Sequence, residues 1–271
     1  MLAYPYFNDF IINTNQIYNI NCIDGVKCIE DESIDMVLTS PPYDNLRNYK
    51  NNITLTWGEH IWKPLIEELY RVLKNNSVVV WIIGDAVING SETGTSFSQA
   101  LYFKEVGFNI HDTMIYQKQT PIPQFKTHRY TNAFEYMFVF SKGKPLKGKL
   151  IEVPTKCSGR IDVNYRGQVT ANEKYIGKKI KMIKNTKIKS NIWIFSQNNG
   201  IDRKINHKAQ FPEQLANDHI ISWSNENDII LDPFMGSGTT AKMAILNNRK
   251  FIGFEISEEY CSIAYNRLKK L

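Results

Sequence analysis

The alternation of short apolar segments with longer amphipathic segments is the feature that most restricts how this chain can fold. Segments with strand-like composition lie at 17–21, 34–40, 77–83, 111–117, 135–141, 228–232 and 250–256. Helical patterns separate many of these segments, at 56–74, 95–107, 211–223, 239–249 and 257–270. Strands that alternate with helices predict a mostly parallel sheet with helices on both faces, and therefore an α/β protein.

Composition excludes several classes of protein. The 271 residues suffice for one large α/β domain or two small ones, and the net charge of +6 permits nucleic-acid binding without requiring it. No apolar run is long enough to cross a bilayer, and the N-terminal residues lack the pattern of a signal peptide. None of the four cysteines has zinc-site spacing. We expect a reducing, cytoplasmic protein without a membrane span or structural metal.

The segment 231-LDPFMGSGTT-240 joins a predicted strand to a predicted helix. Gly236 and Gly238 let the backbone approach a ligand closely and leave amide groups available at the helix start. Glu255 ends the following strand, where an acid binds the ribose hydroxyls of nucleoside cofactors in sheets of this type. Because the segment matches neither G-x-G-x-x-G nor a P-loop, it favours an adenosine cofactor over a pyrophosphate ligand. The alternative is a tight turn without a ligand.

The segment 37-VLTSPPY-43 ends another predicted strand with two adjacent prolines. Because proline cannot continue a central strand, we expect the strand to end at Thr39 or Ser40. Ser40 and the carbonyl of Pro41 can accept hydrogen bonds, and Tyr43 offers a flat ring for stacking. These groups suit a planar ligand with an –NH2, such as the amino edge of a flipped base. The alternative is a rigid turn with a buried tyrosine.

Two of these motifs carry a family resemblance. LTSPPYDNLRNY and LDPFMGSGTT resemble the catalytic and S-adenosylmethionine motifs of DNA amino-methyltransferases, in the β-group order with the catalytic motif first. Further segments that resemble this family are ELYRVLKNNSVVVWIIGD, MIYQKQTPIP, RYTNAFEYMFVFSKGKP and NIWIFSQNNGIDRKINHKAQFPEQLANDHIISWS. The resemblance covers nearly the whole chain except the basic region 143–189.

The resemblance implies an S-adenosylmethionine-dependent methyltransferase fold, with a Rossmann-like sheet of seven strands in circularly permuted order and helices on both faces. It implies a catalytic and cofactor-binding domain at 1–142 and 190–271, with a basic target-recognition region inserted at 143–189. Residues 142–189 contain 14 Lys and Arg against three acids and show little strand or helix periodicity. The alternative is a solvated loop that adds only general electrostatic affinity.

The family motifs assign site residues by resemblance. Catalysis falls on Ser40, Pro41, Pro42 and Tyr43. Cofactor binding falls on Asn21, Phe211, Glu213, Asp232, Pro233, Phe234, Gly236, Ser237, Gly238, Thr239 and Glu255. DNA contacts are expected from Arg47, Arg166, Gln168, Lys178 and Lys179, although Arg47 fits a structural ion pair equally well. Relatives often carry an acid where this chain has Asn21, with Asp24 nearby, and many read His-Pro-Ala where this chain has Lys208 in the middle.

The implied reaction moves a methyl group from S-adenosylmethionine to an exocyclic amino group of a flipped base in double-stranded DNA. In the family, Ser before Pro-Pro occurs more often in enzymes that methylate the cytosine 4-amino group. We therefore rank cytosine as the first candidate substrate and the adenine 6-amino group as the second. Methylation at cytosine carbon 5 is disfavoured because no cysteine follows a proline. RNA or protein-amide methylation and a catalytically inactive DNA-binding module stay open. Further expectations are a homodimer and location in the cytoplasm at the nucleoid, with the protein encoded by a bacterium or a phage. A restriction-modification role beside a cognate endonuclease and a solitary role both stay open.

Overall fold

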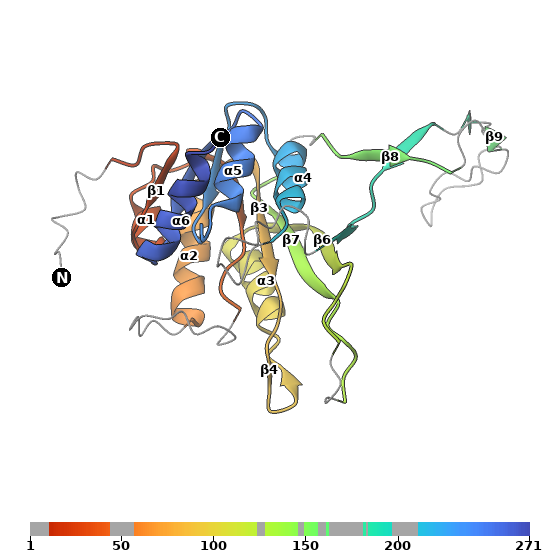
Figure 1. The fold of residues 1–271 in the computed structure, drawn as a ribbon, viewed down its shortest axis with the longest axis horizontal. Helices are drawn as coiled ribbons and strands as arrows, with labels where there is room; N and C mark the ends of the chain where they lie inside the picture. Colours follow the sequence, from red (N-terminus) through yellow and green to blue (C-terminus); the bar gives the residue numbers. More distant parts are fainter. Residues whose placement is uncertain are drawn as a thin grey trace. The chain divides into compact units, whose positions relative to one another are not determined.

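The computed structural model describes residues 11–43, 57–123, 128–145, 149–156, 161–162, 181–182, 184–196 and 211–271. The chain divides into two compact units, and Figure 1 labels many of their helices and strands. The first unit comprises Met1–Lys149 and Asn191–Leu271, and the second comprises Leu150–Ser190. The second unit overlaps the basic region expected at 143–189, whose role in target recognition stays a prediction.

The first unit contains a sheet of eight strands in the order β1-β14-β13-β2-β3-β7-β6-β12. In that order, the strands are Gln16–Tyr18, Lys250–Phe254, Ile229–Asp232, Ile34–Thr39, Leu73–Ile83, Phe134–Ser141, Asn109–Lys118 and Ile192–Phe195. All neighbours are parallel except β7, which runs antiparallel to both β3 and β6. The expected α/β fold with a mostly parallel sheet is confirmed.

The strand order confirms the circular permutation. β13, which precedes the glycine segment and is nearly last in the sequence, lies in the sheet between β14 and β2. β1 lies beside β14, and the last helix, α6 (Glu258–Leu268), reaches it, because the Tyr265 hydroxyl donates to the Ile17 carbonyl at 2.9 Å. The two ends of the described chain therefore meet at one side of the sheet, as a permuted order requires.

All seven expected strands are present, and the structure corrects some of their details. The first strand ends at Tyr18 rather than continuing to residue 21, because Asn21 is the N-cap of a short helix that the sequence pattern did not predict. The helix expected to reach residue 74 ends at Val72, and β3 begins directly at Leu73. β12 is an eighth strand that pairs with β6 beyond the expected seven.

Two groups of helices cover the sheet. α1 (Cys22–Lys27), α2 (Glu59–Val72) and α3 (Thr95–Val106) pack over one core, which includes Val37, Trp81 and Phe254. α4 (Glu213–Trp223) and α5 (Thr239–Leu246) contact each other, and α6 follows β14. Strand side chains alternate between the two faces of a sheet, so Met36 and Leu38 point away from Val37. This arrangement buries β2 and β13 on both faces. The carboxyl ends of these two strands lie at the same edge of the sheet.

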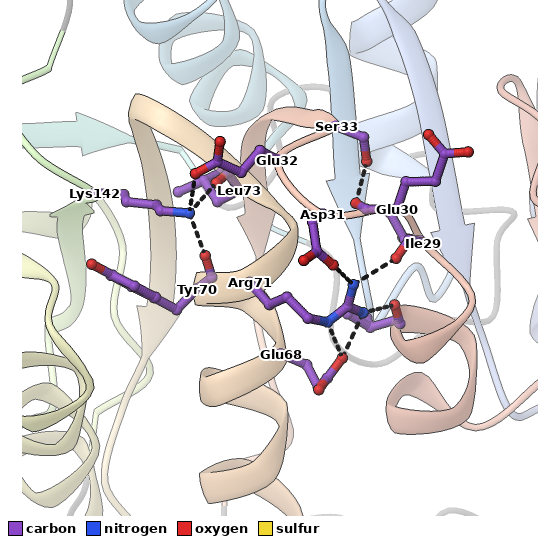
Figure 2. Close-up of polar contacts among 11 residues, drawn as sticks. Ile29, Glu30, Asp31, Glu32, Ser33, Glu68, Tyr70, Arg71, Leu73 and Lys142 are labelled. Atoms are coloured by element: carbon purple, nitrogen blue, oxygen red, sulfur yellow. Dashed lines mark hydrogen bonds and ion pairs between the residues drawn. The ribbon is translucent and has the colours of Figure 1, made fainter.

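Lys142, the residue directly after β7, lies at the opposite edge of the sheet, where β2 begins (Figure 2). Its side chain is buried. Its Nζ donates to the backbone carbonyls of Tyr70 and Leu73, both at 2.9 Å, and pairs with Glu32 at 3.0 Å. The last carbonyls of a helix have no intrahelical partner, and a cation there also complements the helix dipole. Lys142 therefore joins the end of α2 to the end of β7.

Arg71 makes a second polar cluster at this edge (Figure 2). Its guanidinium donates to the backbone carbonyls of Ile29 and Val26 and pairs with Asp31 and Glu68. These contacts connect α2 with α1 and with the turn that leads into β2. The turn before β2 is thereby held against α2.

The second unit contains two small antiparallel pairs. β8 (Glu152–Pro154) pairs with β11 (Thr186–Ile188), and β9 (Ile161–Asp162) pairs with β10 (Lys181–Met182). Strands of two or three residues are too short to give a detectable period in a lysine-rich sequence, so the sequence pattern did not predict them. In the described part of the chain, no helix is both long and apolar enough for a membrane span.

Candidate active site

The two motifs singled out in the sequence lie at the ends of adjacent parallel strands. β2 and β13 pair in register, with Met36 opposite Ile230 and Val37 opposite Leu231. Both strands therefore end at the same edge of the sheet. There the Thr39 hydroxyl donates to Asp232 Oδ1 at 2.6 Å. The loop that starts at Ser40 and the glycine loop leave this edge as neighbours, at the position where open α/β sheets bind ligands.

Asp232 connects the starts of the Ser40 loop and the glycine loop. Its side chain is buried and accepts three hydrogen bonds: from Thr39, from the Thr240 hydroxyl at 2.6 Å and from the Phe234 amide at 3.0 Å. Burial raises its pKa to about 6, although these hydrogen bonds lower it in part. Since protein donors occupy both carboxylate oxygens, Asp232 fixes the geometry of the site, and its expected contact with the cofactor stays a prediction.

The glycine loop adopts the backbone conformation that its sequence predicts. Gly236 and Gly238 have φ angles of 52° and 80°, in the left-handed region that favours glycine. A Cβ on Gly238 would lie 3.0 Å from the Cβ of Ala264, so α6 also requires the small residue. Among the described residues, no side chain caps the start of α5. Its first amide groups therefore face the loop, and such a helix start favours a polar or anionic ligand group.

Glu255, immediately after β14, contacts the glycine loop directly. Its Oε2 accepts from the Gly236 amide at 2.8 Å, and its Oε1 accepts from the Ser257 amide at 2.8 Å. Burial raises the pKa of Glu255, and these amide hydrogen bonds lower it in part. The acid predicted from spacing therefore lies beside the loop, although its binding of ribose hydroxyls stays a prediction.

Arg267 supports the glycine loop from behind, and the sequence reasoning missed it. Its nearly buried guanidinium donates to the Ser237 carbonyl at 3.1 Å, to the Thr239 hydroxyl at 3.0 Å and to Glu213. Lys242 also pairs with Glu213, at 2.7 Å. Glu213, predicted to bind the cofactor, thus joins α4 to α5 and α6 in this structure. The available signal was helical spacing, which puts Arg267 on the buried face of α6.

The remaining predicted cofactor residues surround the same edge. Phe234 is partly buried and packs edge-on against Trp57, with ring centroids 5.4 Å apart, while Pro233 is buried beside it. Phe211 stands two residues before α4 and is partly buried. Asn21 lies three residues beyond β1, and its Oδ1 accepts from the Ile23 amide at 2.9 Å.

The Ser40 loop contains a chain of hydrogen bonds. The hydroxyls of Ser40 and Tyr43 lie 3.1 Å apart, and the Tyr43 hydroxyl donates to Glu135 Oε2 at 2.9 Å. The other carboxylate oxygen of Glu135 pairs with Lys118 at 2.9 Å. Pro41 is buried, whereas Ser40, Pro42 and Tyr43 are partly buried, so the loop packs on Pro41 and leaves its other residues partly open to solvent.

The predicted DNA-binding residues are Arg47, Arg166, Gln168, Lys178 and Lys179, and all lie outside the described residues, as does Lys208. In the described ranges, no cluster of three or more His, Cys, Asp or Glu side chains could hold a metal ion. The described site therefore combines hydrogen-bond acceptors, a ring and an uncapped helix start beside a buried acid. Such groups bind and orient reactants, and they stabilise charge that develops between them.

Comparisons with known proteins agree with this geometry. The family described as DNA methylase, with N6 and N4 acceptors in its name, matches residues 34–266. The chain is 51% identical to the orphan methyltransferase M.BamHII of Bacillus amyloliquefaciens over 247 residues, which are 89% of this chain and 91% of that protein. It is 30% identical to the DNA adenine methyltransferase YhdJ of Escherichia coli (strain K12) over 252 residues, which are 90% and 79% of the two chains.

Solved structures share the fold. The PvuII DNA methyltransferase, named as cytosine-N4-specific, superposes with a TM-score of 0.67 at 21% identity. The match covers 95% of this chain and 87% of that one. It confirms the methyltransferase fold that the sequence motifs implied.

Proposed function

Because the chain belongs to the N6/N4 DNA methylase family, it is a DNA methyltransferase that uses S-adenosylmethionine, and we propose that it methylates the 4-amino group of a cytosine flipped out of duplex DNA. Family membership sets aside the RNA, protein-amide and inactive-module alternatives. The adenine 6-amino group is the second candidate, since one relative is named a DNA adenine methyltransferase.

The observation that carries this proposal is the direct link between the two loops. The Thr39–Asp232 hydrogen bond joins the last residue of β2 to the last residue of β13, so the acceptor loop and the cofactor loop start from one fixed point. Transfer of a methyl group requires a donor sulfur and an acceptor nitrogen in line at close range. Two loops that start from linked strand ends support such an arrangement.

The residues present fit S-adenosylmethionine. The uncapped start of α5, the Glu255 carboxylate beside Gly236 and the ring of Phe234 can hold the polar chain, the ribose and the adenine, respectively. When bound, the cofactor supplies an electrophilic methyl group on a sulfonium sulfur. Hydrogen bonds that join the glycine loop to Asp232 and Arg267 hold this surface in position without a bound cofactor.

The acceptor loop must raise the reactivity of a poor nucleophile. The lone pair of a base amino group is delocalised into its ring, so its nitrogen is weakly nucleophilic. We propose that Ser40 Oγ and the Pro41 carbonyl accept hydrogen bonds from the two amino hydrogens. These bonds favour a pyramidal nitrogen and stabilise the positive charge that develops on it. The ring of Tyr43 would stack on the flipped base.

The choice of cytosine rests on Ser40 as the first residue of the loop, because the family places Asp or Asn there mostly for adenine. We further propose that the second unit and the basic segment around it recognise the target, with Lys178 and Lys179 on phosphates and Arg166 and Gln168 at base edges. A cognate endonuclease and a homodimer stay predictions from the resemblance.

The product nucleoside tests the proposal. The protein is incubated with S-adenosylmethionine that carries a deuterated methyl group and with genomic DNA that lacks methylation, and the DNA is then digested and analysed by mass spectrometry. Labelled 4-methylcytosine is the expected product. Labelled 6-methyladenine would keep the family mechanism but contradict the assigned base.

A further inference from the structure

We propose that Glu135 is a positioning residue that fixes the direction of the hydrogen bonds in the acceptor loop, so that Ser40 presents lone pairs rather than a proton to the base. This inference rests on the proposed function and specifies how its acceptor site selects an amino group. Glu135 lies at the start of β7, outside every motif that the sequence singled out for catalysis.

Four side chains from three elements make the arrangement. Ser40 and Tyr43 come from the loop after β2, Glu135 from the start of β7, and Lys118 from the end of β6. The three contacts measure 3.1 Å between Ser40 and Tyr43, 2.9 Å between Tyr43 and Glu135, and 2.9 Å between Glu135 and Lys118. β3 separates β2 from β7, so the loop crosses the end of β3 to reach Glu135.

Gly84, directly after β3, marks this crossing. A Cβ built on Gly84 would lie 3.7 Å from the Tyr43 ring and 3.7 Å from the Glu135 side chain, which is ordinary contact distance. The Tyr43 ring and the Cγ of Glu135 therefore both lie against the end of β3. Lys118 and Glu135 are each 18% exposed at the side chain, so their pair is only partly open to water.

The number of hydroxyl protons determines which group donates in each hydrogen bond between Ser40, Tyr43 and Glu135. A tyrosine hydroxyl has one proton, and Tyr43 donates it to Glu135. An ionised carboxylate can only accept, and Lys118 occupies its other oxygen with a donated proton. In the contact between Ser40 and Tyr43, the tyrosine oxygen must then accept, so Ser40 donates its own proton away from the base. Both lone pairs of Ser40 Oγ are left as acceptors.

This direction determines which chemical group the site accepts. An amino group donates hydrogen bonds, and Ser40 Oγ and the Pro41 carbonyl would both accept from it. A carbonyl at the same position of a base would meet two acceptors, and this repulsion disfavours its binding. Glu135 thus contributes without touching the base.

The test compares variants by the rate of a single turnover on unmethylated genomic DNA, with enzyme in excess and a labelled methyl group. Glu135→Gln keeps the shape of the side chain but can donate as well as accept, so the direction is no longer fixed. Tyr43→Phe keeps the ring and removes the hydroxyl. We expect each to lower the rate about tenfold, the typical effect of weakening or losing one hydrogen bond to a charged group, without changing the half-saturating concentration of S-adenosylmethionine.

The double variant separates positioning from general structural support. If Glu135 acts through Tyr43, adding Glu135→Gln to Tyr43→Phe lowers the rate no further. If Glu135 only supports the fold, the two losses multiply, and the proposal is overturned. Glu92→Gln is the matched control, because Glu92 also pairs with a cation, Arg129, but is not part of this chain of hydrogen bonds. It should leave the rate unchanged.

Lys118→Met gives a second, independent comparison. It breaks the ion pair between β6 and β7 but leaves the Glu135 acceptor for Tyr43 in place. We expect it to retain most of the wild-type rate, even if Glu135→Gln does not fold. A loss equal to that of Tyr43→Phe would assign the effect to the ion pair and overturn the proposal. The product of the wild-type reaction, analysed in the same samples, shows separately whether the assignment of cytosine holds.

Discussion

The buried Asp232 makes a quantitative prediction about stability and pH. Its pKa is about 6 in the folded protein, against an ordinary value of 3.8, because burial disfavours the charge. Between these two pH values the folded protein holds a proton that the unfolded chain has released. The free energy of unfolding therefore falls as the pH rises through this interval. At about 1.36 kcal/mol per pH unit, the full fall is about 3 kcal/mol.

Asp232→Asn should remove this fall. The amide oxygen of Asn can still accept from Thr39 and from the Phe234 amide. The new NH2 group faces the Thr240 hydroxyl, which can turn its proton to the Leu38 carbonyl, 3.4 Å away. The variant thus keeps its hydrogen bonds but cannot ionise. Relative to wild type, it should gain roughly 2 kcal/mol between pH 4.5 and 7.5, since part of the fall lies below pH 4.5.

Urea unfolding followed by tryptophan fluorescence measures this difference. All five tryptophans belong to the first unit, so the signal reports the sheet that holds Asp232. Thr39→Val is the matched control, because it removes one donor but keeps the carboxylate, and its pH dependence should be at least as large as that of wild type. Equal pH dependence in wild type and Asp232→Asn would refute the reasoning, and so would a variant that loses stability relative to wild type as the pH rises.

Three further predictions follow from the site. Gly238→Ala should lower the free energy of unfolding by about 1–2 kcal/mol, because of its left-handed φ and the neighbouring helix, and should weaken S-adenosylmethionine binding in calorimetry. Arg267→Met should cost about 3 kcal/mol in urea unfolding, because it breaks a buried ion pair, whereas Lys63→Met at an exposed pair should cost only a few tenths. Lys178→Ala with Lys179→Ala should weaken binding to all DNA sequences alike in a salt titration; a change confined to one sequence would contradict their assignment to phosphates.

The sheet could be predicted because its central strands consist of long apolar runs in the sequence. Segment 77–83 belongs to β3, and its buried side chains from Val78 to Ile83 have no polar interruption. The glycine segment could be recognised because two glycines and a distant acid must stand at set spacings around a nucleoside. Both signals lie at recognisable positions in the sequence, so they can be found without the folded structure.

The elements that escaped prediction lack such local signals. α1 has only six residues, CIDGVK, too few for a helical period, and its start depends on a cap from Asn21. β12 has only four residues and depends on pairing with β6, far away in the sequence. To predict either element, one would need to know how the rest of the sheet is arranged.

Supporting side chains are the hardest to foresee. Glu135 is 92 positions from Tyr43, and Arg267 is 30 positions from Ser237. Each is an ordinary charged residue in its own segment, and only the folded chain shows what it contacts. The residues predicted to bind the ligands were inferred from motifs, whereas the contacts of the residues that hold those motifs in place come from tertiary structure.

The central claim is that the Ser40 loop presents acceptors to an amino group beside a cofactor held by the glycine loop. The most direct test is nucleoside mass spectrometry of unmethylated duplex DNA after reaction with deuterium-labelled S-adenosylmethionine, for wild type and Ser40→Ala side by side. We predict labelled 4-methylcytosine from wild type and at least a tenfold lower yield from Ser40→Ala, with cofactor affinity unchanged. Label on a ring carbon, or equal yields from both proteins, would contradict the account.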